Sequence, residues 1–126
     1  MKILLVDDSK TMRNIQKKTL EGLGGTEFGE AGDGVEALGV IGANPAPFDL
    51  MLVDWNMPNM DGITLVKKVR ETNKATPIIM VTTEAEKTRV VDAIKAGVNN
   101  YVIKPFTPEG RMEKVKQTLE KKKAAA

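Results

Sequence analysis

The chain has 126 residues, of which 41% are hydrophobic, 29% charged and only 4% aromatic, and its formal net charge is +2. This composition predicts one compact domain with an aliphatic core. Because the chain contains neither cysteine nor histidine, it excludes disulfides, thiol catalysis, Cys- or His-ligated metals and any Ser-His-Asp arrangement.

The first predicted elements are strands. Four short apolar runs, at residues 3–6, 50–53, 78–81 and 101–103, are typical of strands that are buried on both faces of a sheet. A fifth and weaker run, residues 27–31, contains one glycine and two glutamates. We therefore expect this run at an edge of the sheet.

Segments with helical spacing lie between the strands. Apolar or small residues at positions 12, 15, 19, 20 and 23 of the first segment, and at 90, 93, 94 and 97 of the fourth, predict stripes that face the core. The second segment, residues 34–42, is a weaker helix because Gly39 and Gly42 each cost about 1 kcal/mol relative to alanine. Ser9 and Asp61 are expected as N-caps, and Thr107 with Pro108 opens the last helix.

Five strands that alternate with five helices predict a doubly wound α/β fold, with right-handed crossovers, a parallel sheet and helices on both faces. We expect one domain over residues 1–123, with a loop at residues 44–48, and we exclude the alanines 124–126 from functional interpretation. The absence of a long apolar run indicates a cytoplasmic protein with no membrane segment. The lysines are spread along the chain, which argues against a nucleic-acid surface.

Polar residues follow the apolar runs. Asp7 and Asp8 follow the first strand, Asp54 the third, Thr82 the fourth and Lys104 the fifth. Ligand sites of open parallel sheets form at the carboxyl ends of the strands. We therefore expect three carboxylates, a hydroxyl and an amine to converge around one crevice.

Three close carboxylates need a cation, since one pair at 4 Å repels by about 4 kcal/mol at an effective dielectric near 20. Oxygen ligands without histidine or cysteine favour Mg²⁺. Taken singly, Asp7 and Asp8 would be helix caps and Asp54 a strand-end cap. Together with Lys104 they suit phosphoryl transfer to an aspartate.

These residues resemble the receiver domain of response regulators, and in particular the single-domain chemotaxis members of that family. The resemblance covers essentially the whole chain. It is carried, in order, by the motifs at residues 6–9, 54–62, 81–84, 96–97 and 104–106. It implies a flavodoxin-like sheet with strand order 2-1-3-4-5.

The resemblance also implies a phosphoacceptor protein that is not an enzyme but assists its own phosphotransfer and dephosphorylation. Asp54 would accept the phosphoryl group from a CheA-like histidine kinase. Asp8, Asp54 and the backbone carbonyl of Asn56 would bind Mg²⁺, and Asp7 would help through a bound water.

In the same family, Lys104 would pair with the phosphoryl oxygens, and the Thr82 hydroxyl would move to bond them. That motion would allow Tyr101 to turn inward and change a partner-binding face formed by the fourth helix, fifth strand and fifth helix. The implied partners are the kinase, a FliM-like flagellar motor switch protein and a phosphatase. The resemblance also implies that the regulator is a monomer. Gly110 and Arg111 in the last helix depart from the family pattern, which leaves the partner preference of that face open.

The sequence argues against other functions that share this fold or this chemistry. A flavin-binding flavodoxin relative would need a first loop that attracts phosphate, which Asp7 and Asp8 repel. Aspartyl phosphatases of the haloacid dehalogenase type carry an Asp-x-Asp pattern and a cap domain, and here the two aspartates are adjacent. A phosphorelay intermediate, or a receiver domain cut from a transcriptional regulator, is the alternative within the family.

Overall fold

The computed structural model describes residues 2–22, 27–43, 48–73, 76–82 and 87–103. Strands and helices alternate along this part of the chain, as the sequence predicts: β1 (Lys2–Val6), α1 (Lys10–Glu21), β2 (Glu27–Ala31), α2 (Gly34–Ala43), β3 (Leu50–Asp54), α3 (Gly62–Thr72), β4 (Ile78–Thr82), α4 (Lys87–Ala96) and β5 (Asn100–Ile103). The predicted fifth helix with its cap at Thr107 and Pro108 lies outside the described residues, as do positions 44–47 of the predicted loop.

The five strands form one sheet in the order β2-β1-β3-β4-β5, and all four pairings are parallel. This confirms the doubly wound α/β fold and the edge position of β2. The register aligns the carboxyl ends: Val6 lies beside Val53, and Thr82 lies beside Ile103. Residues that end or follow these strands are therefore brought to one edge of the sheet.

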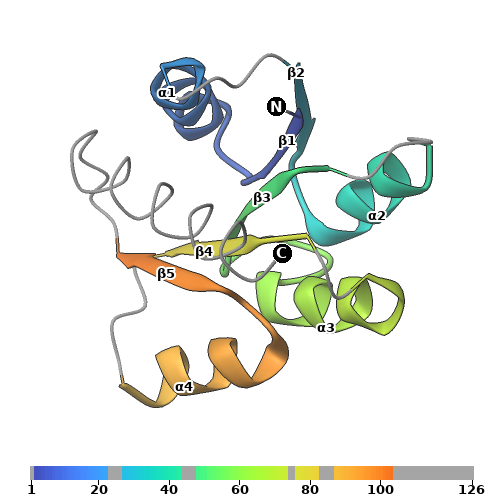
Figure 1. The fold of residues 1–126 in the computed structure, drawn as a ribbon, viewed down its shortest axis with the longest axis vertical. Coiled ribbons are helices and arrows are strands. Elements are labelled where there is room, and N and C mark those ends of the chain that lie inside the picture. The colour runs from blue at the N-terminus through green and yellow to red at the C-terminus, as the bar shows by residue number, and fades with distance from the viewer. Residues whose placement is uncertain (1, 23–26, 44–47, 74–75, 83–86, 104–126) are drawn as a thin grey trace.

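Helices cover both faces of the sheet, with α1 on one side and α2 and α3 on the other (Figure 1). Alternate strand residues point to opposite faces, so the core has two parts. Ile3, Leu5 and Leu52 pack with Leu20 of α1 on the first face. Leu4, Val6 and Met51 pack on the second face with side chains from α2, α3 and α4.

Side-chain caps fix where three helices begin. The Ser9 hydroxyl accepts a hydrogen bond from Met12 N (3.2 Å), and an Asp61 carboxylate oxygen accepts one from Thr64 N (2.9 Å). Both N-caps were predicted, because such oxygens satisfy amides that lack a helical partner. Asp33 caps α2 in the same way, with Oδ1 accepting from Glu36 N at 2.8 Å.

Two predicted core positions are wrong. Ile15 of α1 is 40% exposed and Ile94 of α4 is 58% exposed, whereas Gln16 is 2% exposed and Ala93 is fully buried. Neighbouring helix positions differ by about 100° around the axis, so a residue one position outside the buried stripe points away from the sheet. The inner face of α1 is therefore centred on Gln16 and Leu20, which are one turn apart.

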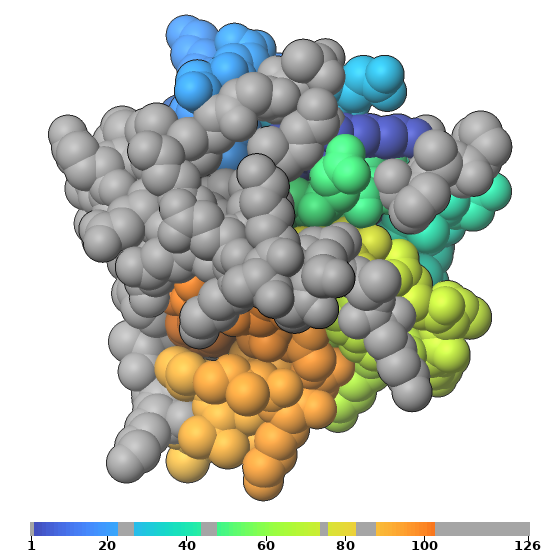
Figure 2. Space-filling view, viewed as in Figure 1, coloured from blue at the N-terminus to red at the C-terminus, as the bar shows by residue number. Residues whose placement is uncertain are grey.

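A groove lies on the surface between α3 and α4. The two helices contact each other and lie next to one another on the molecular surface (Figure 2). A groove of about 670 Å³ runs here, and its walls include Trp55 from the end of β3 and Arg89 from α4. Among the described helices, none has the length and apolarity that crossing a membrane requires.

Candidate functional site

Three carboxylates meet at the carboxyl edge of the sheet. Asp7 and Asp8 follow β1 directly, and Asp54 is the last residue of β3. One carboxylate oxygen of each lies within 4.8 Å of those of the other two. Asp7 and Asp54 are buried, with 1% and 6% of their surface exposed, and Asp8 is exposed. The convergence that the sequence predicted for these three residues is confirmed.

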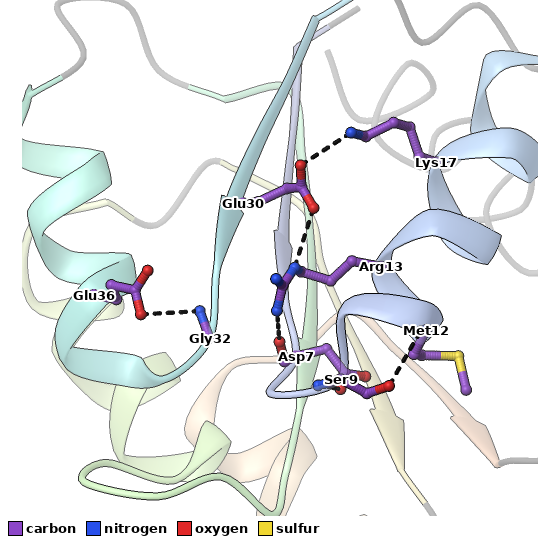
Figure 3. Close-up of polar contacts among 8 residues, drawn as sticks. All are labelled: Asp7, Ser9, Met12, Arg13, Lys17, Glu30, Gly32 and Glu36. Carbon is purple, nitrogen blue, oxygen red and sulfur yellow. Dashed lines mark hydrogen bonds and ion pairs between the residues drawn. The ribbon is translucent and has the colours of Figure 1, made fainter.

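Asp7 is held in place by its surroundings. Its backbone N–H donates to the carbonyl of Ala31 at 3.0 Å, and its Oδ1 accepts a hydrogen bond from Ser9 N at 2.8 Å. The Arg13 guanidinium donates to the backbone carbonyl of Asp7 (Figure 3). The bond from Ser9 N orients the Asp7 carboxylate, and the other two contacts hold the Asp7 backbone in place.

Arg13 brings a positive charge next to the acidic cluster, and sequence reasoning missed it. Its Nε also pairs with Glu30 Oε1 at 3.1 Å, while Lys17 Nζ pairs with Glu30 Oε2 at 2.9 Å (Figure 3). The hydrogen bond from Lys17 is the main cause that holds the pKa of Glu30 below its usual value, with Arg13 adding to it against the effect of burial. The signal that could have revealed Arg13 was Glu30, because a carboxylate within a strand needs a cationic partner.

The loop after β3 carries Asn56 and bends sharply back toward the sheet. Gly62 N donates to the carbonyl of Trp55 at 2.8 Å, and Met60 N donates to the carbonyl of Pro58 at 2.7 Å. A Cβ atom at Gly62 would lie 2.1 Å from the backbone oxygen of Asp54. Only glycine lets the start of α3 approach Asp54 this closely.

The same loop contacts the start of α2. Asn59 has a φ of 65°, a left-handed conformation that asparagine tolerates better than most residues. Its side-chain amide donates to Asp33 Oδ2 at 2.8 Å, and Gly34 N donates to the carbonyl of Met60 at 3.2 Å. The bonds from Glu36 N and the Asn59 amide lower the pKa of Asp33. No local sequence pattern indicated this contact, because it joins segments that are far apart in the chain.

The remaining predicted residues lie on β4 and β5. Thr82 is fully buried at the end of β4, and Tyr101 of β5 is 8% exposed. Thr82 pairs with Ile103, the last residue of β5. Lys104 itself, and Thr83, lie outside the described residues. Trp55 is buried, and the Arg89 guanidinium lies 5.1 Å from the centre of its ring.

A divalent cation fits the donor set of the acidic cluster. Its three candidate ligands are carboxylates, two of them buried, and oxygen donors of this kind suit a hard ion. Close carboxylates with nothing between them repel each other, and a cation removes that cost. The chemistry open to such a site is nucleophilic attack by a carboxylate on an electrophile whose negative charge the cation neutralises.

Comparison with known proteins agrees with this geometry. A family model described as "Response regulator receiver domain" matches residues 3–116. Chemotaxis protein CheY1 of Helicobacter pylori (strain J99) is 54% identical over 121 residues, which cover 94% of this chain and 97% of the relative. A chemotaxis protein CheY homolog of Campylobacter jejuni is 52% identical, with coverages of 94% and 92%.

A solved structure shares the fold. The structure described as the CheX-CheY-BeF3-Mg²⁺ complex from Borrelia burgdorferi matches with a TM-score of 0.88 at 26% identity, covering 93% of this chain and 87% of that one. The family resemblance drawn from the motifs and the strand order 2-1-3-4-5 are both confirmed. With the acidic cluster at the end of β1 and β3 and a family match over nearly its whole length, the chain belongs to the response regulator receiver domain family.

Proposed function

We propose that this receiver domain is a single-domain response regulator of chemotaxis, which accepts a phosphoryl group on Asp54 in the presence of Mg²⁺. The observation that carries the proposal is the cluster of Asp7, Asp8 and Asp54, whose carboxylate oxygens lie within 4.8 Å of one another. The relatives named as chemotaxis proteins support the signalling context, since the match extends over 97% of the Helicobacter protein.

Asp54 is the best nucleophile of the three for a geometric reason. It ends β3, which lies between β1 and β4 in the sheet. The acid pair therefore lies on one side of Asp54, and Thr82 lies on the other. A phosphoryl group on Asp54 can therefore be contacted by groups from both sides.

In the proposed transfer, an Asp54 carboxylate oxygen forms a bond to phosphorus while the P–N bond of a donor phosphohistidine breaks, and its electron pair returns to the imidazole. Asp8, Asp54 and the backbone carbonyl of Asn56 would hold Mg²⁺, with Asp7 acting through a water. The ion would neutralise the phosphoryl charge. Lys104 would pair with the phosphoryl oxygens, and the Thr82 hydroxyl would donate to one of them.

Hydrolysis would remove the phosphoryl group from Asp54. Water attacks phosphorus, the bond to the Asp54 oxygen breaks, and the carboxylate and inorganic phosphate are released. We propose that the protein assists this step with the same groups that favour transfer, so that the signal is reset without a separate active site. A dedicated phosphatase would shorten the lifetime further.

The proposed readout runs through β4 and β5. Thr82 would shift toward the phosphoryl group, and Tyr101 would take up the space beside it, which changes the face formed by α4, β5 and the segment that follows. Both side chains are buried, so a shift of Thr82 or of Tyr101 would require neighbouring side chains to repack. We propose a CheA-like kinase and a FliM-like motor switch protein as partners, and a monomer in the cytoplasm.

Trp55 provides the test, because it is buried directly after Asp54. Mg²⁺ is titrated first, acetyl phosphate is then added, and the fluorescence of the wild type is compared with that of Asp54→Asn. We expect a saturable change with Mg²⁺, and a further donor-dependent change only in the wild type. No response of the wild type to either addition would overturn the proposal. Phosphorylation-dependent binding of a flagellar motor switch peptide would distinguish motor control from a phosphorelay intermediate.

A further inference from the structure

Asp33 lies at a junction between α2 and the β3–α3 loop, and its two carboxylate oxygens have different partners. Oδ1 accepts from Glu36 N at 2.8 Å and so caps α2. Oδ2 accepts from the Asn59 side-chain amide at 2.8 Å. The capping of the helix needs only the first contact. The second ties α2 to a loop that is distant in the sequence.

That loop carries Asn56, a proposed Mg²⁺ ligand through its backbone carbonyl. At one end, the Trp55 carbonyl accepts from Gly62 N at the start of α3. At the other end, the Met60 carbonyl accepts from Gly34 N at the start of α2. The Asn59 amide adds a side-chain contact on the α2 side. The segment with Asn56 is therefore held at both ends by hydrogen bonds, to the start of α3 and to the start of α2.

The approach of the loop to α2 is close. A Cβ atom at Gly34 would lie 2.7 to 2.9 Å from side-chain atoms of Met60, so there is no spare room between the two segments. Asn59 accepts a left-handed backbone, with φ of 65°, in this position. Asn59 therefore fixes the path of the loop through its left-handed backbone, and its side chain attaches the loop to Asp33.

We propose that Asp33 and Asn59 are positioning residues for divalent-cation binding, because their contact holds the β3–α3 loop where the Asn56 carbonyl can serve as a ligand. The inference rests on the proposed function. Residues that orient metal ligands without touching the metal typically change its affinity by about 10- to 100-fold when removed. The Asp33–Asn59 contact is exposed, so we expect an effect of about 3- to 10-fold, at or below that lower limit.

An exchange of the two side chains separates this role from simple loss of a cap. Asn59→Asp places a carboxylate against the Asp33 carboxylate and breaks the contact. The double variant Asp33→Asn with Asn59→Asp restores a donor and an acceptor with reversed direction, and the amide oxygen introduced at position 33 still caps α2. The net charge of the double variant equals that of the wild type.

The measurement is the Mg²⁺ dissociation constant of the full chain, from Trp55 fluorescence and independently from calorimetry. We expect Asn59→Asp to weaken Mg²⁺ binding, although its added negative charge alone would tighten it. The double variant should return to within about twofold of the wild type. Asn59→Gly, which keeps the left-handed backbone accessible and adds no charge, should weaken binding to a similar extent.

Thr19→Ala is the matched control, because it removes an exposed side-chain hydrogen bond of 3.0 Å, from Thr19 Oγ1 to Ile15 O in α1, without changing the charge and without involving the loop. It should leave the Mg²⁺ dissociation constant unchanged. Equal or tighter Mg²⁺ binding by Asn59→Asp, or no recovery in the double variant, would overturn the inference while the proposed function stands. A wild type that fails to bind Mg²⁺ overturns both.

Discussion

Gly62 provides a quantitative test of how tightly α3 is set against the phosphoacceptor strand. A Cβ atom there would lie 2.1 Å from Asp54 O, whereas real Cβ atoms essentially never approach within 3.0 Å. Gly62→Ala must therefore separate two backbone segments by about 0.9 Å, the difference between these distances. That separation breaks the 2.8 Å hydrogen bond from Gly62 N to Trp55 O.

The expected cost has two parts. Overpacking of a rigid site costs about 1–3 kcal/mol, and the lost backbone hydrogen bond costs about 1 kcal/mol. We therefore expect Gly62→Ala to lower the free energy of unfolding by about 2–4 kcal/mol. This is a large share of the roughly 5–15 kcal/mol that stabilises a typical domain.

Urea unfolding measures this loss, provided that the slope of free energy against urea is unchanged. Gly39→Ala is the control, since its Cβ would meet no atom within 4 Å in α2, and we expect it to stabilise the protein by about 0.5–1 kcal/mol. If Gly62→Ala costs less than about 1 kcal/mol, the contact between α3 and Asp54 is not as close as described.

Further predictions concern three charged residues. The partly buried Arg70 guanidinium donates hydrogen bonds of 2.9 to 3.1 Å to oxygens that follow α3 and α4, so Arg70→Lys should cost about 2 kcal/mol in urea unfolding. Lys17 lowers the pKa of Glu30 from 4.5. The stabilisation that this pair gives the folded protein is therefore complete above pH 4.5, and it is lost as the pH falls through the lowered pKa of Glu30. Glu30→Gln should therefore lose less stability than the wild type when the urea midpoint is followed below that pH. Asp8→Asn should raise the free energy of unfolding of the metal-free protein by up to about 1 kcal/mol, because repulsion between the carboxylates is relieved, and should abolish the further increase that Mg²⁺ gives the wild type.

The sheet could be predicted from the sequence because its strands are buried on both faces. Runs such as residues 50–53 and 78–81 are continuous and apolar, and polar residues mark their ends. The edge position of β2 followed from its glutamates and glycine. The convergence of Asp7, Asp8 and Asp54 then follows from topology alone, since parallel strands end at the same edge.

Contacts between separate segments could not be predicted in this way. Arg13 and Glu30 meet only because α1 packs beside β2, and Asn59 reaches Asp33 only because the β3–α3 loop lies against α2. Periodicity also fails to fix the rotation of a helix to within one residue, which is why Ile94 was placed in the core and is exposed. These features depend on packing geometry, which local sequence patterns do not encode.

The proposed switch depends on phosphorylation of Asp54, which intact mass spectrometry detects as an added mass. The protein is incubated with Mg²⁺ and acetyl phosphate, and Asp54→Asn and a chelator-treated sample are run beside it. We expect one phosphoryl adduct per chain in the wild type, and none in Asp54→Asn or after chelation. A wild type that gains no adduct, or an Asp54→Asn variant that gains it equally, would show that Asp54 is not the phosphoacceptor.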